Sequence, residues 1–386
     1  MRSFSQFGND LYSGKRSIDF VGRQKLWYAV SAAMLVLAAI GLFGRHLNLG
    51  LEFRGGSEFR VSSVTNMDNF EARGKTALGT LDTGSDVVVT KIGSGTVRVQ
   101  TEKFENDLTT KVETALASEF KVNLDKVSAS TIGASWGASV SQKALTALVW
   151  FLVLVSLVLA AYFRTWKMSL AALIALAHDL VITVGIYALA GFEVTPASVI
   201  GFLTILGYSL YDTVVVFDKV RENTQAAIGS GHLSYSQAAN QAVNQTLVRS
   251  INTSVVALLP VGSILFIGFF LLGPGTLLDL SLALFIGIAV GTYSSIFIAT
   301  PVLADLRERE PAMIKLRKQA ERYQSTKGRQ ESAVTSLNGP RSDGEGVQDT
   351  LVVTAASGTS ASGRPLHPYV QTGPRNQPKR PPKSKR

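Results

Sequence analysis

The chain of 386 residues contains no cysteine, only four histidines and little charge. Without cysteine it has no disulfide framework, no thiolate nucleophile and no Cys-based metal site. The histidines are scattered, without the spacing of zinc enzymes, and no Walker-type lysine follows the glycines near residue 230, so no metal, nucleotide or other cofactor is expected. Charged residues make up only 17% of the chain, less than in an ordinary soluble protein. This deficit of charge indicates a membrane protein.

The chain is instead rich in long apolar runs. Hydrophobic residues make up 46% of it, and the stretch from Leu145 to Tyr162 contains no Asp, Glu, Lys or Arg. A helix needs about 20 apolar residues to cross a hydrocarbon core of about 30 Å. Because backbone groups cannot stay unpaired in lipid, such runs must be helical. We predict six spans, at Leu26–Leu47, Leu145–Phe163, Met168–Ala190, Ala197–Phe217, Leu247–Leu272 and Leu277–Leu303.

The distribution of basic residues predicts the orientation of these spans. Lys and Arg precede the first span and lie between the second and third, after the fourth and after the sixth, whereas the loops 191–196 and 273–276 contain neither. The positive-inside rule then places both termini in the cytoplasm. Topology therefore explains the net charge of +10 better than nucleic-acid binding does, and no nucleic-acid partner is expected.

The predicted orientation divides the chain into five parts. No cleaved signal peptide is indicated, so the first span is expected to be retained. The parts are a cytoplasmic segment 1–25, the first span 26–47, an external region 48–143, the other five spans in 144–304, and a cytoplasmic tail 305–386.

The external region is long enough for a small folded domain. Its pattern reads strand, helix, strand, strand, helix, strand, with the hairpin signal Gly93-Ser94-Gly95 between the middle strands. This order is the ferredoxin-like arrangement. The predicted bounds are Leu49–Val61, Met67–Leu81, Asp86–Ile92, Thr96–Thr101, Glu105–Phe120 and Lys126–Ile132.

The tail is expected to be helical to about Gln324 and disordered beyond it. From there to Arg386 it is rich in Ser, Gly, Pro and Thr, and such a composition cannot bury enough apolar surface to fold. Its basic end, from Pro378 onward, is either a solvated tail or a segment attracted to anionic lipid headgroups or ribosomal RNA.

Three of the ionisable residues within the predicted spans are candidates for function, because a charge in lipid is costly. Asp179 lies about 11 residues into the third span, near mid-membrane, and Asp212 lies about five residues before the end of the fourth. Arg249 begins the fifth span, at a depth similar to that of Asp212. The two can form a static ion pair that fixes helix register, Arg249 can snorkel to the interface, or Asp212 can act as a proton relay. We favour the relay for Asp212, with Asp179 as a second candidate, and expect the neighbouring His178 to pack between helices or bond to backbone.

Polar and small residues recur at helical spacing around these three residues. We expect those of the fourth and fifth spans to form one polar face each, and those of the sixth to form a small-residue face suited to close helix contact. They are Gly201, Thr204, Tyr208, Tyr211 and Asp212; Gln245, Arg249, Asn252 and Thr253; and Gly287, Gly291 and Ser295.

Several of these segments resemble motifs of the SecF family of protein-export membrane proteins. Residues 207–223, which include Tyr208, Ser209 and Asp212, are similar to the family's GYSxNDxxVxxDRxREN segment. The other similar segments are His178-Asp179 with Thr183 and Gly185, 244–254 with Thr253, Gly287–Ser295 with Gly291, Glu52–Gly56 with Gly55, and Ile132–Gly137 with Gly133. Tyr211 stands where the family usually has Asn, which affects how Asp212 is hydrogen-bonded.

The resemblance implies a bacterial subunit of the RND superfamily, a half-bundle that pairs with SecD in the cytoplasmic membrane. Such a pair associates with the SecYEG channel and with YajC. It uses the proton-motive force to complete translocation of preproteins after the ATP-driven step. The family's proton-coupling residues map onto Asp212 and Arg249, and less directly onto Asp179. The expected contacts are thus SecD, SecYEG, YajC, preproteins, protons and membrane lipids, and the chain is expected to be a transport subunit rather than an enzyme.

Two other functions stay open at this point. One is a subunit of an RND-type exporter of small molecules or lipids, although such chains usually carry both six-span halves. The other is a membrane scaffold without ion coupling, which predicts that Asp212→Asn is tolerated apart from effects on stability.

Overall fold

The computed structural model describes residues 4–79, 87–92, 95–102, 104, 106–272 and 275–337. Residues 1–330 form one compact unit, and residues 331–386 a second one. Of the second unit the structure describes only residues 331–337, which are helical. The basic end of the tail and the middle of the predicted hairpin turn, residues 93–94, lie outside the described residues.

Six helical segments of the described chain are long and apolar enough to span a membrane, which confirms the predicted number. Several extend beyond their apolar part: α6 (Ala134–Phe163) begins 11 residues before the predicted span, and α8 (Pro196–Ser230) ends 13 residues after it. Hydropathy marks where a helix is apolar, not where it ends. The segments are Gln24–Arg45, Trp136–Phe163, Trp166–Ala190, Pro196–Ser230, Tyr235–Leu271 and Thr276–Glu308.

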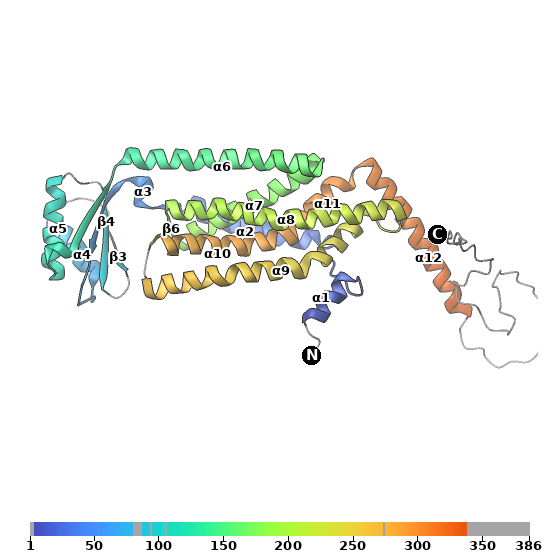
Figure 1. Ribbon diagram of the computed structural model, residues 1–386, viewed down its shortest axis with the longest axis horizontal. Helices are drawn as coiled ribbons and strands as arrows, with labels where there is room; N and C mark the ends of the chain where they lie inside the picture. Colours follow the sequence, from blue (N-terminus) through green and yellow to red (C-terminus); the bar gives the residue numbers. More distant parts are fainter. Residues whose placement is uncertain are drawn as a thin grey trace, which may run out of the picture. The chain divides into compact units, whose positions relative to one another are not determined.

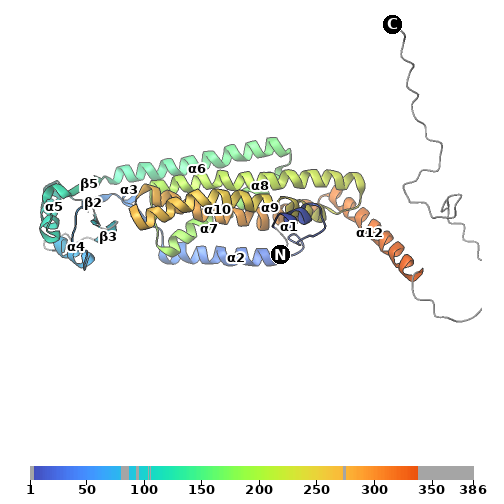
Figure 2. The same cartoon turned by 60° about the horizontal axis from the view of Figure 1, so that its bottom comes forward.

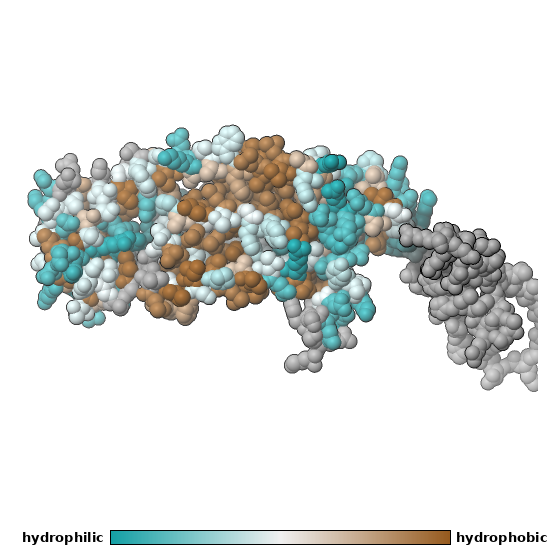
Figure 3. Space-filling view, viewed as in Figure 1, coloured by the Kyte–Doolittle hydropathy of each residue, from teal (hydrophilic) through white to brown (hydrophobic). Residues whose placement is uncertain are grey.

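The bundle packs around α7 (Trp166–Ala190), α8 and α10 (Thr276–Ser294), which lie side by side in Figures 1 and 2. Helices α2 (Gln24–Ile40) and α9 (Tyr235–Ile267) pack against them, and α6 lies at the edge with most of its surface exposed. In Figure 3 the bundle shows a broad apolar surface between two more hydrophilic ends. Exposed side chains such as Leu157, Val256 and Phe269 belong to this surface, which suits lipid contact.

Glycines allow the central helices to approach closely. A Cβ on Gly287 of α10 would lie 2.1 Å from Cδ1 of Ile205 on α8, and a Cβ on Gly201 would lie 2.6 Å from that of Ala283. The chain leaves α10 through two short helical segments, η4 (Ser295–Ala299) and α11 (Thr300–Glu308), before α12 (Pro311–Leu337).

The α/β domain between α2 and α6 has the predicted ferredoxin-like order. Its helices α4 (Phe70–Gly79) and α5 (Asn106–Phe120) pack on one antiparallel sheet of order β3-β4-β2-β5. Side chains such as Phe59, Val99 and Leu116 form its buried core. The strands are β2 (Gly56–Val61), β3 (Val88–Ile92), β4 (Thr96–Thr101) and β5 (Val127–Ile132).

The prediction of one strand over Leu49–Val61 is wrong. The structure has the short strand β1 (Asn48–Leu49), the single-turn helix α3 (Leu51–Arg54) and then β2. Gly55 and Gly56 have φ angles of +77° and +146°, which glycine adopts without strain and which break an extended run. In place of one long strand, the chain thus makes a tight corner before it enters the sheet.

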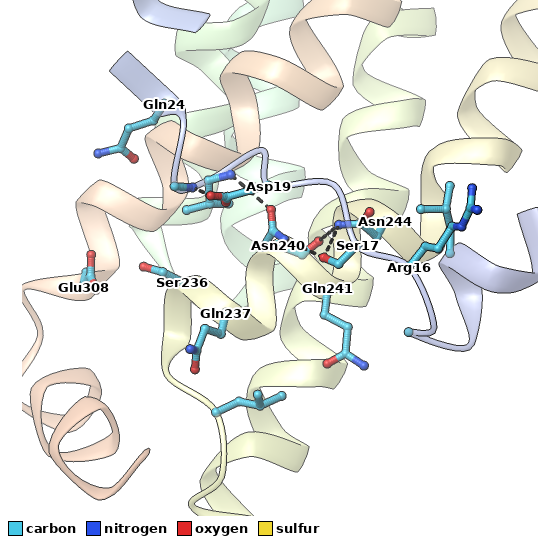
Figure 4. A pocket seen from close by; sticks show the side chains of 15 residues that line it. Arg16, Ser17, Asp19, Gln24, Ser236, Gln237, Asn240, Gln241, Asn244 and Glu308 are labelled. Atoms are coloured by element: carbon cyan, nitrogen blue, oxygen red, sulfur yellow. Dashed lines mark hydrogen bonds between the residues drawn. The ribbon is translucent and has the colours of Figure 1, made fainter. Parts of the chain in front are cut away.

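The segment before α2 is held by two asparagines one turn apart on α9. The side-chain oxygen of Asn240 accepts hydrogen bonds from the backbone N–H of Phe20 (2.7 Å) and Val21 (3.2 Å). Asn244 accepts from the N–H of Ile18 (2.8 Å) and donates to its carbonyl oxygen (2.8 Å). Figure 4 shows both asparagines beside a cavity of about 560 Å³. These bonds fix the N-terminal segment against the bundle at the end away from the α/β domain.

Candidate functional site

Asp212 lies near the middle of α8, and its side chain points into the bundle. Its Oδ1 accepts a hydrogen bond from Oγ of Ser250 on α9 (2.8 Å), and its Oδ2 accepts one from Oγ of Ser295 in η4 (3.0 Å). All three side chains are buried. Three different elements thus meet at this carboxylate, and two neutral hydroxyls satisfy it.

Asp179 lies near the middle of α7 and is fully buried. Its Oδ2 accepts a hydrogen bond from Oγ of Ser209 on α8 (2.5 Å), and its Oδ1 lies 3.1 Å from Nδ1 of His178. The other ring nitrogen of His178 bonds to the hydroxyl of Ser31 on α2. Of the two expectations for His178, packing between helices is confirmed: the imidazole is buried between α7 and α2, where it bridges Asp179 and a serine instead of bonding to backbone.

The two aspartates lie at similar depths of the bundle, about one helical turn apart. Ser209, the partner of Asp179, precedes Asp212 by three residues on α8, a rise of about 4.5 Å along the helix axis. Beyond Asp212 the polar contacts continue, because Oγ1 of Thr292 on α10 donates to Oγ of Ser254 on α9 (2.7 Å). We call this set the polar core; all of its members are buried except Thr292, which is partly buried. It consists of Ser31, His178, Asp179, Ser209, Asp212, Ser250, Ser254, Thr292 and Ser295.

Helix packing accounts for the alignment of these groups. A Cβ on Gly291 of α10 would lie 2.9 Å from Cβ of Ser209, so the missing side chain lets α10 press on the residue that donates to Asp179. Gly287, one turn earlier, makes the corresponding contact with Ile205. The small-residue face of the sixth span therefore lies directly against the helix that carries Asp212.

The structure does not join Asp212 and Arg249 in an ion pair. The Arg249 side chain lies on the exposed surface of α9, where its Nη2 donates to the hydroxyl of Tyr211 (3.3 Å). Within the described residues, no Lys or Arg forms an ion pair with Asp179 or Asp212. The residue of α9 that reaches Asp212 is Ser250, which follows Arg249 and points about 100° away from it.

The single polar face predicted for α8 is therefore wrong, because Asp212 is buried but Thr204 and Tyr211 are exposed. On α9 none of the predicted residues is buried, so their face points outward, and the residue that reaches Asp212 is the buried Ser250. Each helix thus presents polar groups in two directions, one into the polar core and one outward. Tyr208 on α8 and Thr253 on α9 are partly buried. The hydroxyl of Thr253 donates to the carbonyl oxygen of Arg249.

The glycines of the two motifs around the α/β domain lie where the domain meets the bundle. Gly133 is the N-cap of α6, and a Cβ on Gly137 would lie 2.4 Å from the carbonyl oxygen of Phe53 in α3. Together with the corner at Gly55 and Gly56, this contact brings the two ends of the domain close to each other. These glycines therefore have a structural role at the junction.

The polar core contains two carboxyl groups, Asp179 and Asp212, that can each bind a proton. An ionised carboxylate only accepts hydrogen bonds, whereas a protonated one also donates, so each proton taken up forces neighbouring hydroxyls to reorient. A negative charge on either carboxylate would be buried, and within the described residues no Lys or Arg pairs with it, so the energy of this region depends on whether the carboxylates are protonated. Ser250 was not predicted from the sequence, and Ser295 was predicted only as part of a small-residue face, because serines in apolar helices usually bond to their own backbone, as Ser263 does.

Two protein families match the chain. "Protein export membrane protein SecD/SecF, C-terminal" matches residues 111–309, and "SecD/SecF GG Motif" matches residues 40–66. The second match contains the corner at Gly55 and Gly56, and the first contains nearly all of the polar core.

Several named proteins are similar over most of the chain. Protein translocase subunit SecF of Streptomyces coelicolor is 47% identical over 82% of this chain and 84% of its own length. The SecF subunit of Mycobacterium tuberculosis H37Rv is 42% identical over 78% of this chain and 70% of its own. The crystal structure of SecDF, a translocon-associated membrane protein from Thermus thermophilus, matches with a TM-score of 0.67 at 30% identity. That match covers 76% of this chain and 39% of SecDF, so the chain corresponds to a part of the longer protein.

Proposed function

The chain belongs to the SecD/SecF family of protein-export membrane proteins, and on this premise we propose that it is a proton-coupled SecF-type subunit of the Sec translocase. It is a multi-pass membrane protein and a transport subunit. In this role it pairs with SecD and uses the proton-motive force to draw preproteins through the SecYEG channel, with YajC as a further associated protein.

One observation carries the proton-coupling part of this proposal: Asp212 is a carboxylate buried among transmembrane helices and held only by neutral hydroxyls. A carboxylate with a permanent structural role in a membrane normally has a cation beside it. With serine partners, both the charged and the neutral form can be hydrogen-bonded, so a proton can enter and leave. Asp179, with His178 as its neighbour, forms the second half of the path.

We assign the outward polar face of α8 and α9 to contact with SecD. Arg249 and Tyr211 lie on this face, and a guanidinium that faced hydrocarbon would cost several kcal/mol. A second half-bundle with a carboxylate at this depth removes that cost. Arg249 then joins the proton path from the partner's side, and Asp212 joins it from the interior.

We place the chain in the bacterial cytoplasmic membrane, with its α/β domain outside and both termini inside. Basic residues support this orientation, because Arg164, Lys167, Arg307 and Arg309 all lie at the bundle end away from the α/β domain. The α/β domain then faces the preprotein as it emerges.

The proposal is tested by preprotein translocation into inverted vesicles that contain SecD, SecYEG and either the wild-type chain or Asp212→Asn. We expect the variant to reach the same membrane level and to co-purify with SecD, but to lose the stimulation that a proton gradient gives. Asn keeps the shape of Asp and one acceptor oxygen, and its NH2 group can donate to a serine hydroxyl in place of the other oxygen, so a loss of stimulation reports the proton and not the packing. Unchanged stimulation would refute the relay and favour an uncoupled scaffold.

A further inference from the structure

The loop between α7 and α8 joins the two helices that carry the buried aspartates. It contains the two-residue strand β6 (Glu193–Val194) and lies at the bundle end next to the α/β domain (Figure 1). Any relative movement of α7 and α8 that follows protonation of Asp179 or Asp212 is therefore transmitted to this loop.

The loop holds the sheet of the α/β domain through one side chain. Oε2 of Glu193 lies 2.8 Å from Nη2 of Arg98 on β4, and its Oε1 accepts from Nε2 of Gln100 (3.3 Å). The exposed fractions of the Arg98 and Glu193 side chains are 13% and 22%, so water screens the pair only in part. Both carboxylate oxygens of Glu193 are thus committed to the same strand of the sheet.

The backbone of the loop is tied to the same junction. β6 pairs in parallel with β1, and the N–H of Gly50 donates to the carbonyl oxygen of Val194 (2.8 Å). At the start of α8, Oγ1 of Thr195 donates to Oδ2 of Asp279 on α10 (3.0 Å). The loop is therefore anchored to the chain that enters the domain and to a third helix of the bundle. Within the described residues, its hydrogen bonds and ion pair with the sheet itself come from the Glu193 side chain.

We propose that the pair Glu193–Arg98 is a latch that passes movement of α7 and α8 to the α/β domain. This inference rests on the proposed function, because it requires that proton uptake in the polar core moves these helices. Glu193 and Arg98 are positioning residues: neither touches the proton path, and their effect arises through the domain that they hold. Without the latch, protons would still move through the polar core. The resulting movement of α7 and α8 would then reach the α/β domain only through the backbone connections.

The sheet provides a matched control in a second ion pair. Arg60 and Glu58 on β2 lie 2.6 Å apart, on the same α/β domain, and the Arg60 side chain is 56% exposed. Glu58 also lies 4.0 Å from Nη1 of Arg98, so the control variant changes Arg60 and leaves Glu58 in place. Arg60→Gln therefore makes the same chemical change as Arg98→Gln without touching the α7–α8 loop.

The test is a double-mutant cycle in vesicles that contain SecD, SecYEG and the full chain. Arg98→Gln, Glu193→Gln, the two together, Arg98→Lys and Arg60→Gln are compared for ATP-driven translocation with and without a proton gradient. We expect each of the first two to reduce the gradient-stimulated component by about fivefold, the low end of typical coupling between sites. The double variant should be no worse than either single one. Arg98→Lys, which keeps the charge, should retain most of the stimulation, and Arg60→Gln should retain all of it.

Several outcomes would overturn the latch. These are full stimulation in the single variants, losses that add in the double variant, or an equal loss in Arg60→Gln. A matching fall in membrane level or in gradient-independent translocation would also overturn it, because the pair would then only stabilise the fold. Asp212→Asn measured in parallel separates the two proposals. If it loses stimulation while the latch variants keep theirs, the latch alone fails, and if it keeps stimulation, the proposed function fails.

Discussion

Substitution of Gly287 by alanine tests whether the polar core depends on close contact between α8 and α10. The new Cβ would lie 2.1 Å from Cδ1 of Ile205 and 2.6 Å from both of its γ carbons. All three distances are far below van der Waals contact, and all three atoms belong to one buried side chain. Relief therefore requires either a new rotamer of Ile205 or separation of the two helices.

The size of the effect follows from two opposing terms. Overpacking of a well-packed core costs about 1–3 kcal/mol, and the contact distances place Gly287→Ala near the upper end. Replacing glycine by alanine inside a helix stabilises the helix by about 1 kcal/mol. We therefore expect the free energy of unfolding to fall by about 2 kcal/mol.

The assay is reversible unfolding in mixed micelles, with Gly207→Ala as the matched control. Gly207 lies on the exposed side of α8, and a Cβ there would meet no atom of a neighbouring helix within 4 Å, so this change should be neutral or slightly stabilising. Ile205→Ala removes all three clashing atoms, and in that background Gly287→Ala should cost far less than in the wild type. An equal effect of Gly287→Ala and Gly207→Ala would refute the packing argument.

Three further changes probe other parts of the structure. Ser250→Ala removes one of the two hydrogen-bond donors to Asp212, and such a bond contributes about 1.5–3 kcal/mol when the acceptor is charged. We expect weaker gradient-stimulated translocation at normal membrane level. Ser263→Ala, which loses only a hydrogen bond to the backbone, should have no effect. Asn240→Ala releases the backbone of the N-terminal segment, so trypsin should cut before the first span faster than in the wild type, and an unchanged digestion rate would contradict the role of this asparagine. Gly137→Ala places a Cβ 2.4 Å from a backbone carbonyl oxygen of α3, so it should lower the thermal stability of the chain in detergent, whereas an unchanged melting temperature would show that the junction is loose.

The number of spans and the order of the α/β domain could be predicted because each depends on a local pattern. Long apolar runs identify helices in a membrane, and alternation between glycine-rich turns identifies the strands. The ends of the helices could not be predicted from hydropathy. α9, for example, begins at Tyr235 because Ser234 and Gln237 form a capping box there, well before the apolar part starts.

The aspartates of the site could be predicted, but not their partners. Asp179 and Asp212 stand out because carboxylates are rare in spans. Their serine partners look the same in the sequence as serines that bond to their own helix, and the choice between Ser250 and Arg249 depends on a helix rotation of about 100°. The contact of Glu193 with Arg98 joins residues 95 positions apart, on elements whose relative placement no local pattern encodes.

The central claim is that Asp212 takes up and releases a proton while the chain works with SecD. Infrared difference spectroscopy on membranes that contain the pair, recorded between a high and a low pH, measures the carboxyl stretch of protonated Asp side chains directly. The account predicts a band that appears at low pH in the wild type and is missing in Asp212→Asn, with the rest of the spectrum and the co-purification with SecD unchanged. An identical carboxyl band in both proteins would contradict it, because Asp212 would then hold the same protonation state throughout.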